Sequence, residues 1–281
     1  MERIAWVTDS TAFLDEELSQ NDHVYVVPMI VIIEGKEYED GVDLQSEELY
    51  RRMKEENKVP TTSQPSVGKF YELYRKLEKD YDCVISIHLS SKLSGTVSSS
   101  RQAAQLVTIP VHVFDTLLIS FPMLLILKKL MKYLNSGYSI EEAFTNTRRY
   151  ADSHETYVLI GSLDQLHRSG RLTGAQYYLG SLLSLKPIIT IENGLLQTKT
   201  KTRNLKKAEN HIFNEFLKSV SLGNVKECSI LYGGSPIQVE HLKKKIYEAF
   251  PEVKIHISPL GSAIGVHTGE ETIGISWFKE V

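Results

Sequence analysis

The sequence predicts an α/β protein of two domains, and two observations carry that prediction. The chain has 281 residues, whereas one domain usually takes about 100–200. Through residue 152, short apolar runs alternate with amphipathic segments, which is typical of a parallel sheet covered by helices on both faces. Near Ser153 the pattern resets. We therefore expect an N-terminal three-layer domain over residues 1–152 and a C-terminal α/β domain with a mixed or antiparallel sheet over residues 153–281.

In the first domain, apolar runs predict strands and i, i+3, i+4 spacing predicts helices. Pro28 bends its run or places it at a sheet edge, and the turn at residues 34–36 predicts a hairpin. Ser46, Ser66 and Ser139 are placed to cap helices. The expected strands are residues 4–7, 24–33, 82–89 and 111–114, and the expected helices are residues 46–56, 67–77, 96–106, 117–134 and 140–151.

In the second domain, the clearest element is a hairpin, because Asn193-Gly194 suits a type I′ turn. Gly170 is placed to end a short helix, and Ser235 is placed to cap another. The expected strands are residues 157–160, 186–191, 195–199, 228–232, 254–258 and 272–278, and the expected helices are residues 163–171, 173–183, 204–220 and a segment from residue 235 onward.

Two further segments are expected to be loops. Residues 59–66 contain two prolines and four hydroxyl side chains, so their backbone is restricted. Residues 260–269 are glycine-rich and contain His267, whose side chain would then be held for contact and not for packing. In the helix of residues 96–106, we expect Val97, Ala103, Ala104 and Leu106 to face inward.

Composition and charge exclude several classes of protein. Hydrophobic residues make up 42% and charged residues 24% of the chain, as in ordinary soluble proteins. The net charge of −3 gives no reason to expect nucleic acid or an anionic membrane as partner. Cys83 and Cys228 lie in apolar runs and predict buried free thiols. The longest apolar stretch, residues 117–127, is shorter than the ~20 residues of a membrane helix, and residues 4–7 are too short a run for a signal peptide. We expect a soluble cytoplasmic protein without stable membrane insertion.

Clusters of small polar residues follow three expected strands, at residues 8–11, 90–96 and 115–116. In parallel sheets, ligands gather at the carboxyl ends of the strands. The first amides of a helix lack intrahelical partners and favour negative charge, so the Ser- and Gly-rich run before residue 96 is suited to an anion. The alternative is that these residues only cap a helix.

Few catalytic classes are open to this chain. It has no phosphate-binding loop, no dinucleotide fingerprint and no metal-ligand spacing among its histidines. A hydrolase that uses Ser94 as nucleophile and His267 as base is possible, although no orienting acid is apparent. Arg171 and Arg203 could hold an anion or a partner's carboxylate or phosphate by bidentate bonds, but exposed arginines often have no specific role.

Several segments together resemble the DegV family. They occur in order from one end of the chain to the other. The matching segments are Thr8-Asp9-Ser10-Thr11, Thr62-Ser63-Gln64-Pro65-Ser66, Ser90-Ser91-Lys92-Leu93-Ser94-Gly95-Thr96, Leu172-Thr173-Gly174-Ala175 through Leu182-Leu183-Ser184-Leu185-Lys186-Pro187, Gly194, Lys201-Thr202-Arg203 and His267-Thr268-Gly269.

The resemblance implies two α/β domains with a long-chain fatty acid held in a tunnel between them. It also implies that the chain is the fatty-acid-binding subunit of a bacterial fatty acid kinase and not an enzyme by itself. A separate ATP-binding subunit would phosphorylate the carboxylate, and no cofactor or metal would be needed. By the same resemblance, Thr62, Ser94 and His267 bind the carboxylate, and Arg171 and Arg203 face the kinase subunit. Chain length, unsaturation and oligomeric state do not follow from it.

The chain departs from the family pattern at three places. Glu270-Glu271 replace the usual Pro-Gly after Gly269, and residues 115–119 replace an Asp-Ser stretch. Ser169 replaces the first glycine of a Gly-Gly-Arg run. The second change predicts a reshaped acyl tunnel. A third hypothesis, beside the lipid carrier and the hydrolase, is a regulator or interaction protein with a degenerate pocket.

Overall fold

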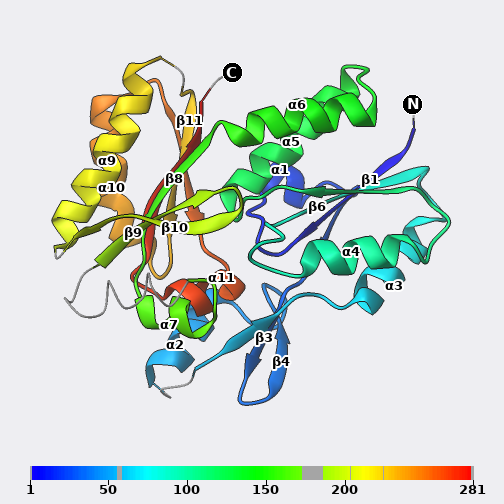
Figure 1. Cartoon of the computed structure of the whole chain (residues 1–281), viewed down its shortest axis with the longest axis horizontal. Helices are drawn as coiled ribbons and strands as arrows, with labels where there is room; N and C mark the ends of the chain where they lie inside the picture. Colours follow the sequence, from blue (N-terminus) through cyan, green and yellow to red (C-terminus); the bar gives the residue numbers. More distant parts are fainter. Residues whose placement is uncertain (1, 56–58, 173–185, 203, 224, 280–281) are drawn as a thin grey trace.

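The computed structural model describes residues 2–55, 59–172, 186–202, 204–223 and 225–279 (Figure 1). The helix expected at residues 173–183 and the side chain of Arg203 lie outside these residues. The described residues form three sheets: a four-stranded parallel sheet, a three-stranded antiparallel sheet and a six-stranded mixed sheet. The α/β class and the two kinds of main sheet agree with the prediction, whereas the boundary between residues 152 and 153 stays a prediction.

The parallel sheet has the strand order β2-β1-β6-β7. Its central strands, β1 and β6, are almost fully buried because helices cover both faces, as the alternation of strands and helices predicted. The strands are β1 (Ile4–Asp9), β2 (Val24–Val27), β6 (Cys83–His88) and β7 (Val111–Asp115).

The side chains of successive β1 residues point to opposite faces of this sheet. Ala5 and Val7 pack in a cluster with Phe70 and Tyr74 of α3, while Trp6 packs in a cluster with residues of α5. Figure 1 shows α3 and α4 below the sheet and α5 and α6 above it, which is the predicted three-layer arrangement. The helices of this part are α1 (Glu16–Ser19), α3 (Val67–Leu77), α4 (Thr96–Ala104), α5 (Phe121–Asn135) and α6 (Ile140–Asp152).

The small antiparallel sheet has the order β4-β3-β5 and is packed against helix α2 (Ser46–Glu55). Pro28 lies between β2 and β3, so the run at residues 24–33 divides between two sheets. The loop expected over residues 59–66 is wrong in part, because Thr61–Ser63 pair with β3 as strand β5. The other strands of this sheet are β3 (Ile30–Ile33) and β4 (Lys36–Glu39).

The mixed sheet has the order β10-β9-β8-β13-β11-β12, and its only described parallel pair is β11 with β12. Asn193 and Gly194 form the predicted tight turn between β9 and β10, both with positive φ. The strands are β8 (His154–Leu159), β9 (Lys186–Glu192), β10 (Leu195–Thr202), β11 (Glu227–Tyr232), β12 (Lys254–Pro259) and β13 (Ile273–Phe278).

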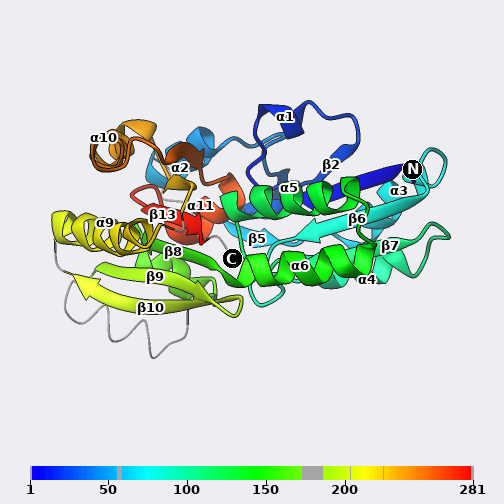
Figure 2. The same cartoon turned by 90° about the horizontal axis from the view of Figure 1, so that it is seen from above.

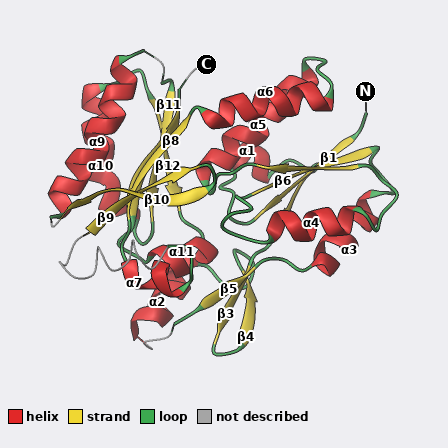
Figure 3. Ribbon diagram, viewed as in Figure 1, coloured by secondary structure: helices red, strands yellow, loops and turns green. Residues whose placement is uncertain are grey.

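Helices α9 and α10 cover one face of the mixed sheet, and its other face is turned toward the parallel-sheet part (Figures 1 and 2). The secondary-structure colouring in Figure 3 shows helix α11 between the mixed sheet and the small sheet. The helices are α7 (Leu163–Arg168), α9 (Leu205–Ser221), the 3₁₀ turn η1 (Pro236–Val239), α10 (Glu240–Ala249) and α11 (Ser262–Thr268).

The structure corrects three further expectations. Residues 260–269 are not a loop, because Ser262–Thr268 form α11 in close contact with α2 and β3. Helix α5 begins at Phe121, since Leu117 and Ser120 adopt positive φ angles of 56° and 68° that no α-helix allows. Leu106 does not face inward but lies beyond the end of α4 with 60% of its surface exposed. Both cysteines are buried free thiols, as predicted.

Candidate functional site

A cavity lies between the parallel and mixed sheets, and its empty space amounts to about 950 Å³ when the part open to solvent is included. Residues from both parts of the chain form its wall, and most of them are apolar. The apolar lining comprises Met29, Leu89, Leu93, Ile119, Pro122, Val158, Ile160, Leu166, Ile189, Ile191, Leu196, Leu231, Leu260, Ala263 and Ile264.

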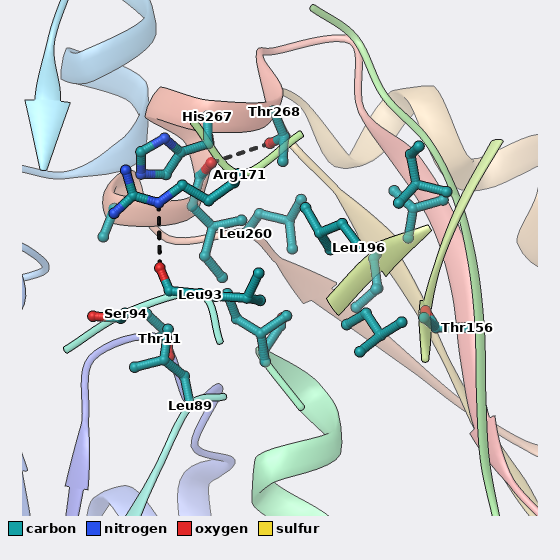
Figure 4. Close-up of a pocket in the computed structure, with 18 of the residues that line it drawn as sticks. Thr11, Leu89, Leu93, Ser94, Thr156, Arg171, Leu196, Leu260, His267 and Thr268 are labelled. Carbon is teal, nitrogen blue, oxygen red and sulfur yellow. Dashed lines mark hydrogen bonds between the residues drawn. The ribbon is translucent and has the colours of Figure 1, made fainter. Parts of the chain in front are cut away.

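A group of polar side chains lies at one end of this cavity, and other polar residues, among them His154 and Thr156, line it elsewhere. Figure 4 shows His267, Arg171, Ser94 and Thr11 on one side of the apolar lining, with Leu196 on the other side. Thr62, Gln64 and Thr268 also line the cavity. We call the end at Ser94, Arg171 and His267 the head end. An apolar cavity with polar groups at one end fits an amphipathic ligand that has a long tail.

The small polar clusters that follow β1, β6 and β7 come together as predicted. The backbone N–H of Leu89 donates to the Asp9 carboxylate at 3.0 Å, and the N–H of Ser91 donates to the Asp115 carboxylate at 3.2 Å. Parallel strands end at the same edge of the sheet, so their following loops meet there. These two carboxylates act on the backbone and hold the loop that carries Ser94.

The same loop is also bonded to the mixed sheet. The hydroxyl of Ser90 is buried and donates to the carbonyl of Gly194 at 2.7 Å. Gly194 has φ of +81°, and a Cβ at this position would lie 2.5 Å from the Ser90 hydroxyl oxygen. Glycine is therefore required by both backbone conformation and close approach.

Thr62 and His267 are in direct contact at the head end. Thr62 Oγ1 and His267 Nε2 share a hydrogen bond of 2.7 Å, although the residues are 205 positions apart in the chain. Strand β5 places Thr62 through its pairing with Val31, and α11 places His267. His267 Nδ1 is buried and has no hydrogen-bond partner. A ligand oxygen beside this ring would give it one.

Ser94 lines the same cavity and precedes helix α4. Its hydroxyl shares a hydrogen bond of 2.9 Å with Thr96 Oγ1. Gly95 separates the two residues, and a Cβ on Gly95 would lie 3.0 Å from the Gln64 side-chain nitrogen. The glycine thus allows Gln64 to pack closely against the start of α4. Gly95 is the N-cap residue of α4 and no side chain caps the helix, so the Ser94 hydroxyl contributes to the cavity wall instead.

Arg171 is half-buried and also lines the head end. Its Nε donates to the carbonyl of Leu93 at 3.2 Å, and its Nη1 donates to the carbonyl of Ser169 (Figure 4). Burial lowers the pKa of this guanidinium, which still carries a positive charge at neutral pH. A cation beside buried hydroxyl groups favours an anionic head group. Arg203, the second arginine of the prediction, lies outside the described residues.

Asp40 holds the helix that carries His267. Its carboxylate is buried, accepts a hydrogen bond of 2.8 Å from the Ser10 hydroxyl and bonds to the backbone N–H groups of Ser262 and Ala263. These amides are the first of α11, where a negative charge is favourable. Burial raises the pKa of Asp40. The sequence analysis did not identify Asp40, and only its place before a turn glycine, Gly41, could have suggested a fixed role.

Electrostatics keep the imidazole of His267 neutral in the empty site. Burial lowers the pKa of His267 to about 4, and the nearby charge of Arg171 contributes to that shift. Both effects penalise the imidazolium form. A carboxylate bound between His267 and Arg171 would oppose them.

The hydrolase hypothesis finds no support in this geometry. The Ser94 hydroxyl bonds to Thr96 and the Nε2 of His267 bonds to Thr62, so no hydrogen bond joins the proposed nucleophile to the proposed base. A different Asp–His–Ser series does occur, in which Asp9 Oδ2 lies 3.0 Å from His88 Nδ1 and His88 Nε2 lies 2.7 Å from Ser86 Oγ. These three side chains are fully buried and do not line the cavity. They are part of the core, where they hold Leu89 and Thr11 in place.

The departures at residues 115–119 and 270–271 lie on either side of the site. Ile119 and Ser120 line the cavity, so the altered segment after β7 does shape it. After α11, the carbonyl of Glu270 accepts a hydrogen bond of 2.8 Å from the N–H of Gly234. This bond fixes the turn that follows Gly269 without the family's usual proline.

The described residues contain no group of three or more His, Cys, Asp or Glu side chains positioned to hold a metal ion. Among the described helices, none has the length and apolar character needed to cross a bilayer.

Comparisons with known proteins agree over nearly the whole chain. The DegV family model, described as "Uncharacterised protein, DegV family", matches residues 3–280. A DegV domain-containing protein of Listeria innocua is 34% identical over 98% of both chains. A structure described as showing fatty acid binding of a DegV family protein from Thermus thermophilus is 33% identical, covers 99% of both chains and has a TM-score of 0.89.

A second similar structure is that of the Streptococcus pneumoniae Fatty Acid Kinase (Fak) B3 protein loaded with linoleic acid. It covers 99% of this chain and 100% of its own, with a TM-score of 0.84 and 19% identity, and at that identity the likeness concerns the fold. The family model and the Listeria relative each span almost the full length of the chain. This chain belongs to the DegV family.

Proposed function

We propose that this protein binds one long-chain fatty acid in the cavity between its two main sheets. The observation that carries the proposal is the division of the cavity into a long apolar wall and a polar head end that includes Thr62, Ser94 and His267. Each methylene group removed from water contributes about 0.8 kcal/mol, so the tail supplies most of the affinity. The fatty acid binding described for the Thermus relative supports the same ligand class.

The head-end residues would satisfy the fatty acid carboxylate. A buried carboxylate without hydrogen bonds is costly, and the hydroxyls of Thr62 and Ser94 can each donate one. His267 offers a nitrogen that lacks a partner, and Arg171 offers a compensating charge. The tail supplies most of the affinity. The polar groups orient the ligand so that its carboxylate enters last and lies at the head end.

We further propose that the carboxylate is presented to a separate ATP-binding kinase subunit that forms the acyl phosphate. The chain would then act as a carrier, in the reducing interior of the cell. The support is the family resemblance of the Arg171 and Arg203 segments, together with the fold shared with the Fak B3 protein. Ser91 and Lys92 lie exposed in the loop that carries Ser94, where a partner could reach the head end.

A double substitution tests the carboxylate assignment. Thr62→Ala with Ser94→Ala should weaken fatty acid binding at least about tenfold, because hydrogen bonds to a charged group are worth roughly 1.5–3 kcal/mol each. The matched control is Thr61→Ala with Ser98→Ala, which makes the same chemical changes at exposed neighbours in β5 and α4. Titration calorimetry on delipidated protein measures both. Equal affinity in the test and control variants would refute the assignment.

A further inference from the structure

The cavity follows strand β8 away from the head end. Alternate residues of one strand face the same side, and Ile160, Val158, Thr156 and His154 all line the cavity. Ile160 is close to the head end, because the nearby N–H of Ser162 donates to the carbonyl of Thr268 at 2.8 Å. Figure 4 shows Thr156 on the side away from His267 and Arg171.

The length of this wall fits one long acyl chain. Six residue steps separate Ile160 from His154, which at roughly 3.3 Å per step gives about 20 Å. The apolar core of a bilayer is about 30 Å thick and contains two acyl chains end to end, or about 15 Å for each. A tail of that length, laid along β8 from Ile160, would reach Thr156, and a group at its end would lie between Thr156 and His154. We call these two residues the tail end.

The tail end combines polar and apolar side chains. Val158 and Ile189, which are paired between β8 and β9, line the middle of the cavity. His154 and Thr156 line the tail end beside Ile191 and Leu196, which are paired between β9 and β10. The Nε2 of His154 lies 2.9 Å from the Ser276 hydroxyl, but its buried Nδ1 has no hydrogen-bond partner. The methyl end of an ordinary fatty acid would leave this nitrogen unpaired, at a cost of about 1–3 kcal/mol.

The chemistry of the tail end favours a neutral polar group. Burial lowers the pKa of His154 to about 3, so its imidazole is neutral. A neutral imidazole has one nitrogen that donates and one that accepts, and a hydroxyl can pair with either. A second carboxylate would have no free cation beside it: Arg171 is the only arginine or lysine among the described residues that line this cavity, and it lies at the head end. Arg148 lies in the adjoining cavity beyond His154, and its guanidinium donates to the carbonyls of Asp115 and Thr116.

The tail end also adjoins a second cavity. His154 and Ile191 line both the acyl cavity and a more polar one formed in part by Arg148, Asp152 and Asn193. These two side chains therefore form a partition between the cavities, and the end of the tail does not meet a closed apolar core.

We propose that the tail end is a hydroxyl-binding site, formed by His154 and Thr156, and that the ligand class includes long-chain fatty acids with a hydroxyl group at or near the end of the tail. The inference rests on the proposed fatty acid binding and adds the chemistry of the far end of the ligand. In this proposal, His154 determines the specificity of the cavity for hydroxylated over plain fatty acids.

The test compares ligands of equal length on delipidated protein. Titration calorimetry would measure palmitic and stearic acids, their ω-hydroxy forms and the corresponding α,ω-dicarboxylic acids. The intact protein should bind at least one ω-hydroxy acid as tightly as, or more tightly than, its unsubstituted counterpart, and the dicarboxylic acids more weakly. The comparison needs no variant, so it does not depend on a substitution that folds.

Two variants assign the effect to the tail end. His154→Leu should weaken binding of the ω-hydroxy acid relative to the plain acid by about tenfold, the loss expected for one unpaired buried hydroxyl. Thr156→Val should shift the ratio in the same direction. His241→Leu is the matched control, because it makes the same chemical change at a side chain that is 79% exposed and should leave the ratio unchanged.

The outcomes separate this inference from the proposed function. Saturable binding of the plain acids with clear discrimination against every ω-hydroxy acid would overturn the hydroxyl site and leave fatty acid binding intact. The same ratio in the wild-type, His154→Leu and Thr156→Val proteins would also overturn it. If neither kind of acid binds, both the proposed function and this inference fail.

Discussion

His267 shares its Nε2 with Thr62 and has no partner at Nδ1, so the empty site leaves half of a buried imidazole unpaired. A buried nitrogen without a hydrogen bond costs free energy, and a ligand that bonds to it would remove that cost. Arg171 adds a charge at the same end and lowers the pKa of His267 further. At the scale of single residues, the charge of Arg171 and the unpaired His267 nitrogen both favour an anion at the head end. Without such a ligand, the unpaired nitrogen makes the folded protein less stable.

The lowered pKa of His267 predicts how stability depends on pH. The unfolded chain takes up a proton near pH 6.5, whereas the folded, lipid-free protein resists until about pH 4. The folded pKa is the lower one, so this contribution is fully present above pH 6.5 and is lost as the pH falls from 6.5 toward 4. Between pH 7 and pH 5, the free energy of unfolding should fall by about 1–2 kcal/mol more in the wild-type protein than in His267→Gln.

Urea unfolding at the two pH values measures this difference. His241 is a suitable control position, because its side chain is 79% exposed, and His241→Gln should keep the wild-type dependence on pH. Parallel pH profiles for the wild-type protein and His267→Gln would contradict the proposed burial of a neutral imidazole.

The sequence predicted the head-end residues better than it predicted their surroundings. One cavity is lined by Thr62, Ser94, Arg171 and His267. These residues could be predicted because each motif segment that carries them is recognisable in the sequence. Asp40, Gln64 and His154 were not identified. Their importance comes from contacts with residues far away in the chain, and no local pattern encodes those contacts.

Helix α11 is the element that connects the two main parts of the molecule at the site. Its residues Ala263, Ile264, His267 and Thr268 line the cavity. On its other side, Gly265 packs against Tyr50 of α2, where a Cβ would lie 2.5 Å from the tyrosine hydroxyl oxygen and 2.9 Å from Cζ. Because Gly265 has no side chain, α11 can pack close against Tyr50 of α2. This close packing determines the position of His267 in the cavity.

Gly265→Ala should displace α11 and weaken fatty acid binding. We expect a loss of stability of about 1–3 kcal/mol, as for overpacking in a well-packed interior, together with a measurable fall in affinity. Gly68→Ala is the matched control, because Gly68 is also helical but a Cβ there would meet only Ser66 Oγ at 3.6 Å. That variant should be neutral or up to about 1 kcal/mol more stable. Thermal unfolding and lipid titration measure both, and equal behaviour of the two variants would argue against a positioning role for Gly265.

Two elements show why local sequence was insufficient. Strand β5 has only three residues, all of them polar with hydroxyl groups, and it is a strand because Thr62 pairs with Val31. Helix α11 has a glycine in its middle and one on each flank, Gly261 and Gly269, and it is stabilised by Asp40 and by α2. Elements with regular spacing, such as α3 with Phe70, Tyr74 and Leu77 buried, were predicted correctly.

At the scale of the whole molecule, the site exists only where two sheets meet. The Ser90–Gly194 hydrogen bond joins the loop after β6 to the hairpin of the mixed sheet, and α11 packs on the small sheet from the other side. The alternation of strands and helices was enough to predict the α/β class and both main sheets. It could not predict the cavity between them, because that depends on how the two parts pack.

The proposed carrier must also bind the kinase subunit, and substitutions at the two arginines test this interaction. Arg203→Glu should abolish acyl phosphate formation by the kinase subunit, while the purified variant retains its bound fatty acid. Arg171→Glu should weaken both, because Arg171 lines the head end and its charge compensates the carboxylate. Arg101→Glu with Lys218→Glu, which reverses charge at exposed positions of α4 and α9, should leave both unchanged. Loss of lipid from Arg203→Glu in step with loss of phosphorylation would assign Arg203 to the cavity instead.

The most direct test of the account is mass spectrometry of an organic extract from the purified protein. We predict one dominant class of long-chain fatty acid, at close to one molecule per chain, released only when the protein is denatured. A protein that contains no fatty acid and also fails to take one up from a mixed pool of plain and hydroxylated acids would contradict the central claim that the cavity is a fatty acid site.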